Sequence, residues 1–128
     1  MPAFTKLEEI QVWKKAREVT KRIYTVTSDG EFDRDFGLRD QIRRSSVSMM
    51  ANIAEGFGRR SDHEFANFLN IAHGSATETH SHLYVALDLG YITKGDFDDL
   101  SGALDEIGKM TFSLASRLRT QGRISRAP

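Results

Sequence analysis

Hydrophobic residues recur at intervals of three and four along four long stretches of the chain, and charged residues fill the opposite faces. This period is typical of amphipathic helices. The first helix is predicted to begin near Thr5, where Thr5 and Glu8 have the spacing of a capping box, and to end through Gly30. Its apolar face consists of Val12, Ala16, Val19, Ile23 and Val26.

The second helix follows an acidic connection of about ten residues, SDGEFDRDFG. It is predicted to run from about Leu38 to Ala54 or Phe57, where glycines mark its end. One face carries the aliphatic residues that a bundle core requires. The other face is polar, so this helix differs from an ordinary core helix.

The third and fourth helices have clear start signals. Ser61 and Glu64 form a second capping-box sequence, and the third helix continues from there to Gly90. Thr93 can cap the fourth helix. This last helix has the cleanest apolar pattern in the chain, made of Phe97, Leu100, Leu104, Ile107, Thr111, Leu114 and Leu118.

The pattern predicts an all-α fold. No segment alternates with period two for long enough to form a β-strand, and the two prolines, Pro2 and Pro128, leave the interior free for long helices. Four amphipathic helices with short connections favour an antiparallel up-down four-helix bundle. We expect one bundle domain over residues 1–119 and a flexible basic C-terminal tail over residues 120–128.

Composition narrows the functional classes. The 18 basic and 18 acidic residues give a formal net charge of zero, so a nucleic acid would have to be held by a local patch. The absence of cysteine excludes disulfides, thiolate nucleophiles and cysteine-ligated zinc, and it suits a reducing compartment. The apolar runs are too short to span a bilayer. We therefore expect a cytoplasmic protein without a membrane partner.

The polar face of the second helix is the first candidate site. On a wheel of 100° per residue, this face gathers Gln41, Arg44, Ser45, Ser48, Asn52 and Glu55. Small hydroxyls and an amide let another backbone approach closely and can hydrogen-bond across the contact. We predict an oligomer interface made of Gln41, Ser45, Ser48, Asn52 and Glu55. A ligand contact and simple exposure to solvent are the alternatives.

A second candidate is the concentration of arginines on and after the same helix. Five of them lie within 22 residues, namely Arg39, Arg43, Arg44, Arg59 and Arg60. Guanidinium groups bind phosphate oxygens in pairs without reading bases, so these residues are predicted to contact the backbone of RNA or DNA. The alternative is a salt-bridge network with Glu55, Glu64 or the acidic connection.

Catalytic and metal chemistry find little support in the sequence. All four histidines fall in the third helix, where His73 and His80 share a face and Glu78 precedes His82 by four residues. A metal site needs three or four convergent ligands, which this spacing does not supply. No strand-turn-helix elbow surrounds a serine. We expect no enzymatic activity, cofactor or metal, and a site built on His73, His80 and Glu78 is the weakest hypothesis.

Three quoted segments resemble a known family. They are LEEIQVWKKA, then FGLRDQIRRSSVSMMANIAEGFGRRSDHEFANFLNIAHGSATE, and finally LDLGYIT. Their order is similar to that of the four-helix-bundle family of 23S rRNA intervening-sequence proteins, over about residues 7 to 95. The resemblance implies an antiparallel four-helix subunit and ring-shaped pentamers. It also implies a link to nucleic acid, because family genes lie within intervening sequences of ribosomal RNA genes and a distant relative, the accessory variability determinant of retroelements, binds nucleic acid.

Two functional hypotheses follow. The first is a non-enzymatic, homo-oligomeric binding or scaffolding protein whose arginines contact RNA or DNA phosphates. The second is an adaptor that binds only protein, in which the same arginines pair with Glu55, Glu64 and Glu78 within or between subunits.

Overall fold

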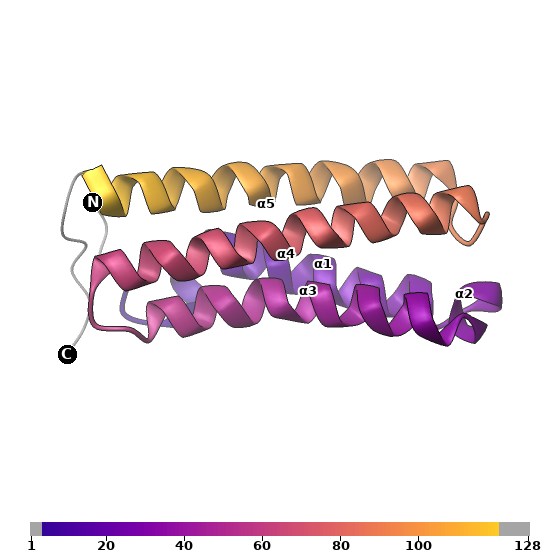
Figure 1. Ribbon diagram of the computed structural model, residues 1–128, viewed down its shortest axis with the longest axis horizontal. Coiled ribbons are helices and arrows are strands. Elements are labelled where there is room, and N and C mark those ends of the chain that lie inside the picture. Colours follow the sequence, from indigo (N-terminus) through magenta and orange to yellow (C-terminus); the bar gives the residue numbers. More distant parts are fainter. Residues whose placement is uncertain (1–3, 121–128) are drawn as a thin grey trace.

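The computed structural model describes residues 4–120 and is built from helices (Figure 1). A 3-10 turn, η1, covers Leu7–Glu9, and the helices are α1 (Gln11–Thr27), α2 (Gly30–Arg34), α3 (Phe36–Phe57), α4 (Asp62–Asp88) and α5 (Lys94–Thr120). The predicted all-α four-helix bundle is confirmed. The predicted tail lies outside the described residues except for Thr120, which ends α5.

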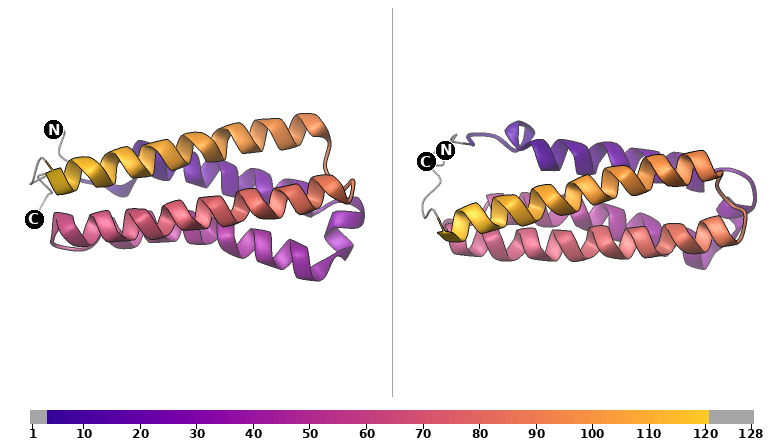
Figure 2. Two further views of the ribbon diagram at one scale, coloured as in Figure 1. Left: turned by 45° about the horizontal axis from the view of Figure 1, so that its top comes forward. Right: turned by 90° about the horizontal axis from the view of Figure 1, so that it is seen from above.

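The four long helices lie side by side along one axis, with consecutive long helices antiparallel (Figures 1 and 2). Around the bundle the order is α1, α3, α4 and α5, and α5 also contacts α1. Lys15 of α1 and Glu106 of α5 form an ion pair of 2.8 Å across this last contact. The helix that carries the polar face, α3, therefore lies between α1 and α4.

The beginning of the first helix differs from the prediction. Glu9, rather than Glu8, accepts hydrogen bonds from the backbone N–H and hydroxyl of Thr5, at 2.7 and 2.6 Å. These bonds lower the pKa of the Glu9 carboxyl. They stabilise the 3-10 turn, and Ile10 then adopts an extended conformation before α1 begins at Gln11. Burial of the Ile10 side chain, which is 1% exposed, favours this break.

The acidic connection contains a short helix that the sequence pattern does not predict. Gly30 has a φ of +59° and begins α2, whereas α1 has already ended at Thr27. The positive φ explains why glycine occupies this position. Phe32 in α2 is fully buried, and its ring lies 5.3 Å from the ring of Tyr91. A connection that looks polar in sequence therefore contributes to the core.

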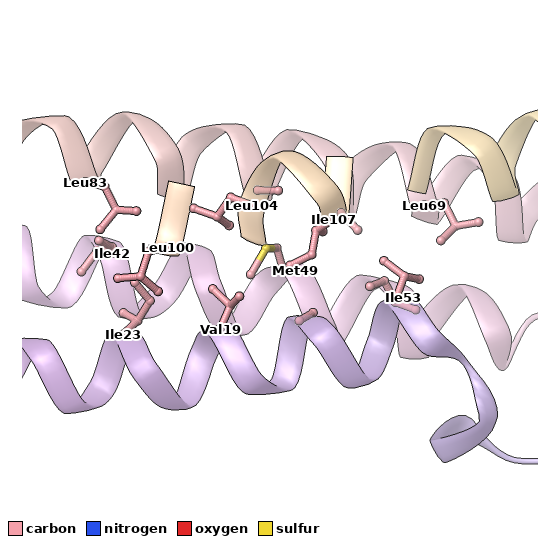
Figure 3. Packing of buried hydrophobic residues seen from close by; sticks show 14 of the residues in the cluster. Val19, Ile23, Ile42, Met49, Ile53, Leu69, Leu83, Leu100, Leu104 and Ile107 are labelled. Carbon is pink, nitrogen blue, oxygen red and sulfur yellow. The ribbon is translucent and has the colours of Figure 1, made fainter. Parts of the chain in front are cut away.

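The core is a continuous column of aliphatic side chains between the four long helices (Figure 3). The predicted apolar faces supply it, and each long helix contributes. The labelled members in Figure 3 are Val19, Ile23, Ile42, Met49, Ile53, Leu69, Leu83, Leu100, Leu104 and Ile107. The capping predictions for the last two helices are also confirmed, because Ser61 accepts from the N–H of Glu64 and Thr93 from that of Asp96.

Gly56 sets the distance between α3 and α4 near the turn that joins them. A Cβ atom at this position would lie 2.7 Å from the Cβ of Phe68 and 2.9 Å from a ring carbon of Phe65. Both distances are shorter than van der Waals contact. The two helices can therefore approach this closely only because residue 56 has no side chain.

A hydrogen bond joins the two turns at the other end of the bundle. The hydroxyl of Tyr91, in the α4–α5 turn, donates to Oδ2 of Asp35 at 3.0 Å. The other carboxylate oxygen of Asp35 accepts from the N–H of Leu38 and caps α3. The hydrogen bond to Asp35 raises the pKa of Tyr91, with a smaller contribution from burial.

Replacing Gly56 with alanine should destabilise the protein by about 1–3 kcal/mol, because the added methyl group overpacks the α3–α4 contact. Gly102→Ala is the matched control, since a Cβ there meets nothing within 4 Å. It should instead stabilise α5 by about 0.5–1 kcal/mol. Urea unfolding followed by circular dichroism measures both changes. Equal effects of the two substitutions would contradict the packing argument.

Replacing Tyr91 with phenylalanine should lower stability at pH 7 and alter its pH dependence. Because the pKa of Tyr91 is raised on folding, its contribution is fully present below pH 10 and is lost as the pH rises through the folded-state pKa. The stability difference between wild type and Tyr91→Phe should therefore shrink above pH 10. Chemical unfolding at pH 7 and pH 10.5 tests this, with Tyr24→Phe as the control, and a constant difference would refute it.

Candidate functional site

The small hydroxyls of α3 face α4 of the same chain. The Ser45 and Thr79 hydroxyl oxygens are 2.7 Å apart, and those of Ser48 and Ser75 are 2.9 Å apart. Ser45 is only 4% exposed. Its side chain is therefore already enclosed by its own subunit, and a contact of Ser45 with another subunit stays a prediction. Ser48 is half-buried and lies at the margin of the contact.

The other predicted interface residues are at the accessible edge of the contact between α3 and α4. Gln41 and Glu55 are exposed, and Asn52 is half-buried. The amide of Asn52 donates to the carbonyl and the hydroxyl oxygen of Ser48, at 2.8 and 3.0 Å. The single chain leaves these three side chains on an accessible strip, and their contact with another subunit stays a prediction.

A matching strip on α4 was not predicted from the sequence. Ile71, Ser75, Glu78 and Val85 follow at spacings of four, three and seven and share one side of the helix. Ile71 and Val85 are 51% and 44% exposed. The Ser48–Ser75 hydrogen bond joins the two strips, which we call the α3–α4 surface: Gln41, Ser48, Asn52 and Glu55 with Ile71, Ser75, Glu78 and Val85. The sequence contained one indication of this strip, because Ile71 and Val85 are aliphatic and yet lie off the core face of the helix.

Arg39 is engaged by carboxylates and by a ring. It bonds to Asp33 at 3.2 Å and to Asp40 at 3.1 Å, and its guanidinium lies 4.8 Å from the centre of the Phe36 ring. Asp40 first, and then Asp33, raise the pKa of Arg39. This arrangement matches the salt-bridge alternative for Arg39.

Arg43 closes the end of α1. Its Nε donates to the Thr27 hydroxyl at 2.8 Å and its Nη2 to the Ser28 hydroxyl at 3.0 Å. The guanidinium also lies 4.7 Å from the centre of the Tyr24 ring. A cation at a helix C-terminus is favoured by the helix dipole. Arg43 therefore has a structural role that the sequence analysis missed.

Of the three remaining arginines, one forms an ion pair with a carboxylate and two form no hydrogen bond or ion pair with the described residues. Arg59 pairs with Glu55 at 2.8 Å and lies over the Phe68 ring. Arg44 and Arg60 are exposed and make no hydrogen bond or ion pair with the described residues. The helix between Arg44 and Phe57 is roughly 20 Å long. The five arginines of the predicted phosphate site are close in sequence, but they do not form a single patch on the structure.

The histidine-rich side of α4 borders a groove beside α5. His80 Nδ1 lies 3.6 Å from Oδ1 of Asp105, whereas His82 lies 3.2 Å from Glu78 on its own helix. Between residues 4 and 120, no three histidine or carboxylate side chains converge in a way that could hold a metal ion. His73, His80 and Glu78 are thus not brought together as one set.

Comparison with known proteins relates this arrangement to a family. The model of the family described as 23S rRNA-intervening sequence protein matches residues 8–113. The chain belongs to this family. No match was found among curated proteins.

This family member also resembles a solved structure. That solved structure is the crystal structure of a protein with unknown function from the S23 ribosomal protein family of Bacteroides thetaiotaomicron. The two are 32% identical with a TM-score of 0.75, over 81% of this chain and 97% of the other. The likeness supports the bundle for this family member. Between Phe4 and Thr120, none of its helices is both long and apolar enough to cross a membrane.

The contacts of Arg43 and Arg44 predict effects of different size on the free energy of unfolding. Arg43→Ala should destabilise the protein by about 1–2 kcal/mol, because it removes two hydrogen bonds and a cation–π contact. Arg44→Ala should change stability by less than about 0.5 kcal/mol. Thermal and urea unfolding of both variants provide the measurement. If Arg43→Ala were as stable as wild type, the structural role of Arg43 would be wrong.

Proposed function

We propose that this family member is a non-enzymatic, homo-oligomeric scaffold that binds a second copy of itself through the α3–α4 surface. The observation that carries the proposal is the exposure of Ile71 and Val85 beside the polar strip of α3. Exposed apolar groups contribute favourably to the free energy of association when a partner buries them.

The charges of this surface suit a protein partner better than a nucleic acid. Glu55 and Glu78 are acidic, and Arg44 lies next to the polar strip on α3. A surface with both signs can pair with another subunit, whereas phosphates require a net positive patch. Three of the five arginines already have partners inside the chain. These contacts favour the protein-only alternative over phosphate binding.

A ring of five subunits, which the family resemblance implies, places a further requirement on the surface. In a closed ring each subunit contacts its neighbours through two different faces. The α3–α4 surface would then meet another face of the adjacent copy. The subunit number is part of the proposal and is read directly by the experiment below.

Phosphate contact is the second candidate, and it rests on Arg44 and Arg60. These two guanidinium groups are exposed and free of partners among the described residues. In an oligomer, their repetition around the assembly would bring several cations together. Binding of RNA or DNA would then depend on assembly and weaken as salt concentration rises.

The test is light scattering coupled to size-exclusion chromatography. Wild type should elute as a defined oligomer, whereas Ile71→Glu and Val85→Glu should reduce the mass toward that of a single chain, because each buries a charge at the contact. Val47→Glu is the matched control. Val47 is 41% exposed and lies one turn after Arg43, on the side of α3 toward α1.

Several outcomes distinguish the candidates. A wild-type protein that elutes as a monomer would refute the assembly proposal. If Val47→Glu dissociated the oligomer as much as Ile71→Glu and Val85→Glu do, the α3–α4 surface would not be the interface. The same columns run with a pool of short RNA and DNA test the second candidate. It requires a gain of mass at low salt that disappears in the Arg44→Ala, Arg60→Ala double variant. Circular dichroism confirms that each variant remains helical.

A further inference from the structure

A groove of about 450 Å³ lies between α4 and α5, on a different side of α4 from the α3–α4 surface. Ala76 and Leu104 form its floor, and Gly108 leaves space opposite His73, where a Cβ would lie 3.5 Å from the imidazole Nε2. This volume is within the range of roughly 300–1,000 Å³ that is usual for small-molecule sites. The groove therefore results from small residues on both helices.

One end of the groove combines a cation, an imidazole and an exposed ring. Lys109, His73 and Phe112 line this end. Phe112 is 68% exposed, the highest value among the large hydrophobic residues that the structure exposes between residues 4 and 120. The Lys109 ammonium and the His73 ring form no ion pair or side-chain hydrogen bond with the described residues. These groups are available to a ligand.

The other end is occupied by internal contacts. The Asp105 carboxylate lies 3.6 Å from His80, and the His80 ring stacks on Tyr84 with 5.5 Å between centroids. Asp105 is an acceptor for hydroxyl or amino groups, and its charge would repel an anion. An anionic group therefore fits only at the Lys109 end, and uncharged donors fit near Asp105.

We propose that this groove binds a nucleotide, with the base stacked on Phe112 and the phosphate held by Lys109 and His73. A phenyl ring provides a stacking surface for any base, and lysine is a common phosphate ligand. The same chemistry is present in a free mononucleotide and in a nucleotide of single-stranded RNA. The proposal does not depend on the α3–α4 surface or on assembly.

Isothermal titration calorimetry with AMP, adenosine and inorganic phosphate tests the groove. Phe112→Ala should weaken AMP binding roughly tenfold, since it removes the stacking surface. Lys109→Gln should weaken the binding of AMP but leave that of adenosine unchanged. Phe112 carries the decisive test, because Lys109 also borders a second groove near Met110 and Arg117.

Two substitutions elsewhere are matched controls. Phe36→Ala removes a phenyl ring that is 64% exposed, and Lys14→Gln removes an exposed lysine of α1. Both variants should bind AMP as wild type does. Because Phe112 is outside the core, Phe112→Ala should keep the wild-type unfolding curve, and that curve is measured alongside.

A ten-residue oligoadenylate distinguishes the two sources of the ligand. Tighter binding of the oligomer than of AMP, lost in Phe112→Ala, would identify RNA as the source. Equal affinity per site would identify the free nucleotide. The proposal is overturned if neither AMP nor oligoadenylate binds, or if Phe112→Ala binds them as tightly as wild type. Failure here would leave the oligomer measured by light scattering unaffected.

Discussion

The close approach of α3 and α4 is the constraint on which the rest of the structure depends. Gly56 permits close contact near the turn that joins the two helices, and farther along them the hydroxyls of Ser45 and Ser48 meet those of Thr79 and Ser75. Long side chains at these positions would separate the helices. Small hydroxyls keep them close, and because they pair with one another, no polar group is buried without a partner there. The polar character of α3 is thus a condition of packing.

This packing decides which groups of α3 remain available. Hydroxyls that face α4 are used inside the subunit, whereas Gln41, Asn52 and Glu55 at the margin stay accessible. On the opposite side, Arg43 reaches the end of α1 and satisfies hydroxyls there. The uncharged polar groups of α3 that stay accessible are therefore confined to a narrow strip, and the exposed apolar area beside it belongs to Ile71 and Val85 of α4.

The sequence was sufficient for the long helices and insufficient for contacts between them. A periodic pattern over many residues predicts an amphipathic helix, and the apolar faces of α1, α3, α4 and α5 all reach the core. The short α2 was missed because five residues cannot display a period, and only the burial of Phe32 justifies it. Ile10 interrupts the predicted first helix for a similar reason, since burial outweighs local propensity.

The candidate site was harder to predict because a helical wheel gives directions but not neighbours. It placed Ser45 on the polar side of α3, yet α4 covers that part of the side. The arginines were grouped because they are close in sequence, whereas Arg39 and Arg59 have carboxylate partners near opposite ends of the helix. Such pairings depend on which helix lies alongside, and a charge in sequence does not reveal whether it is already neutralised.

The neutral net charge makes local geometry decisive for binding. Without a long-range field, a ligand or subunit is recognised only where several groups converge. α4 contributes to two such places on different sides: Ile71 and Val85 lie beside α3, and His73 lies beside α5. The small residues of its buried face keep α3 close, while Gly108 on α5 leaves the groove open. α4 therefore presents an exposed apolar strip and a groove on separate sides of one helix, and the two surfaces we propose can be changed independently by substitution.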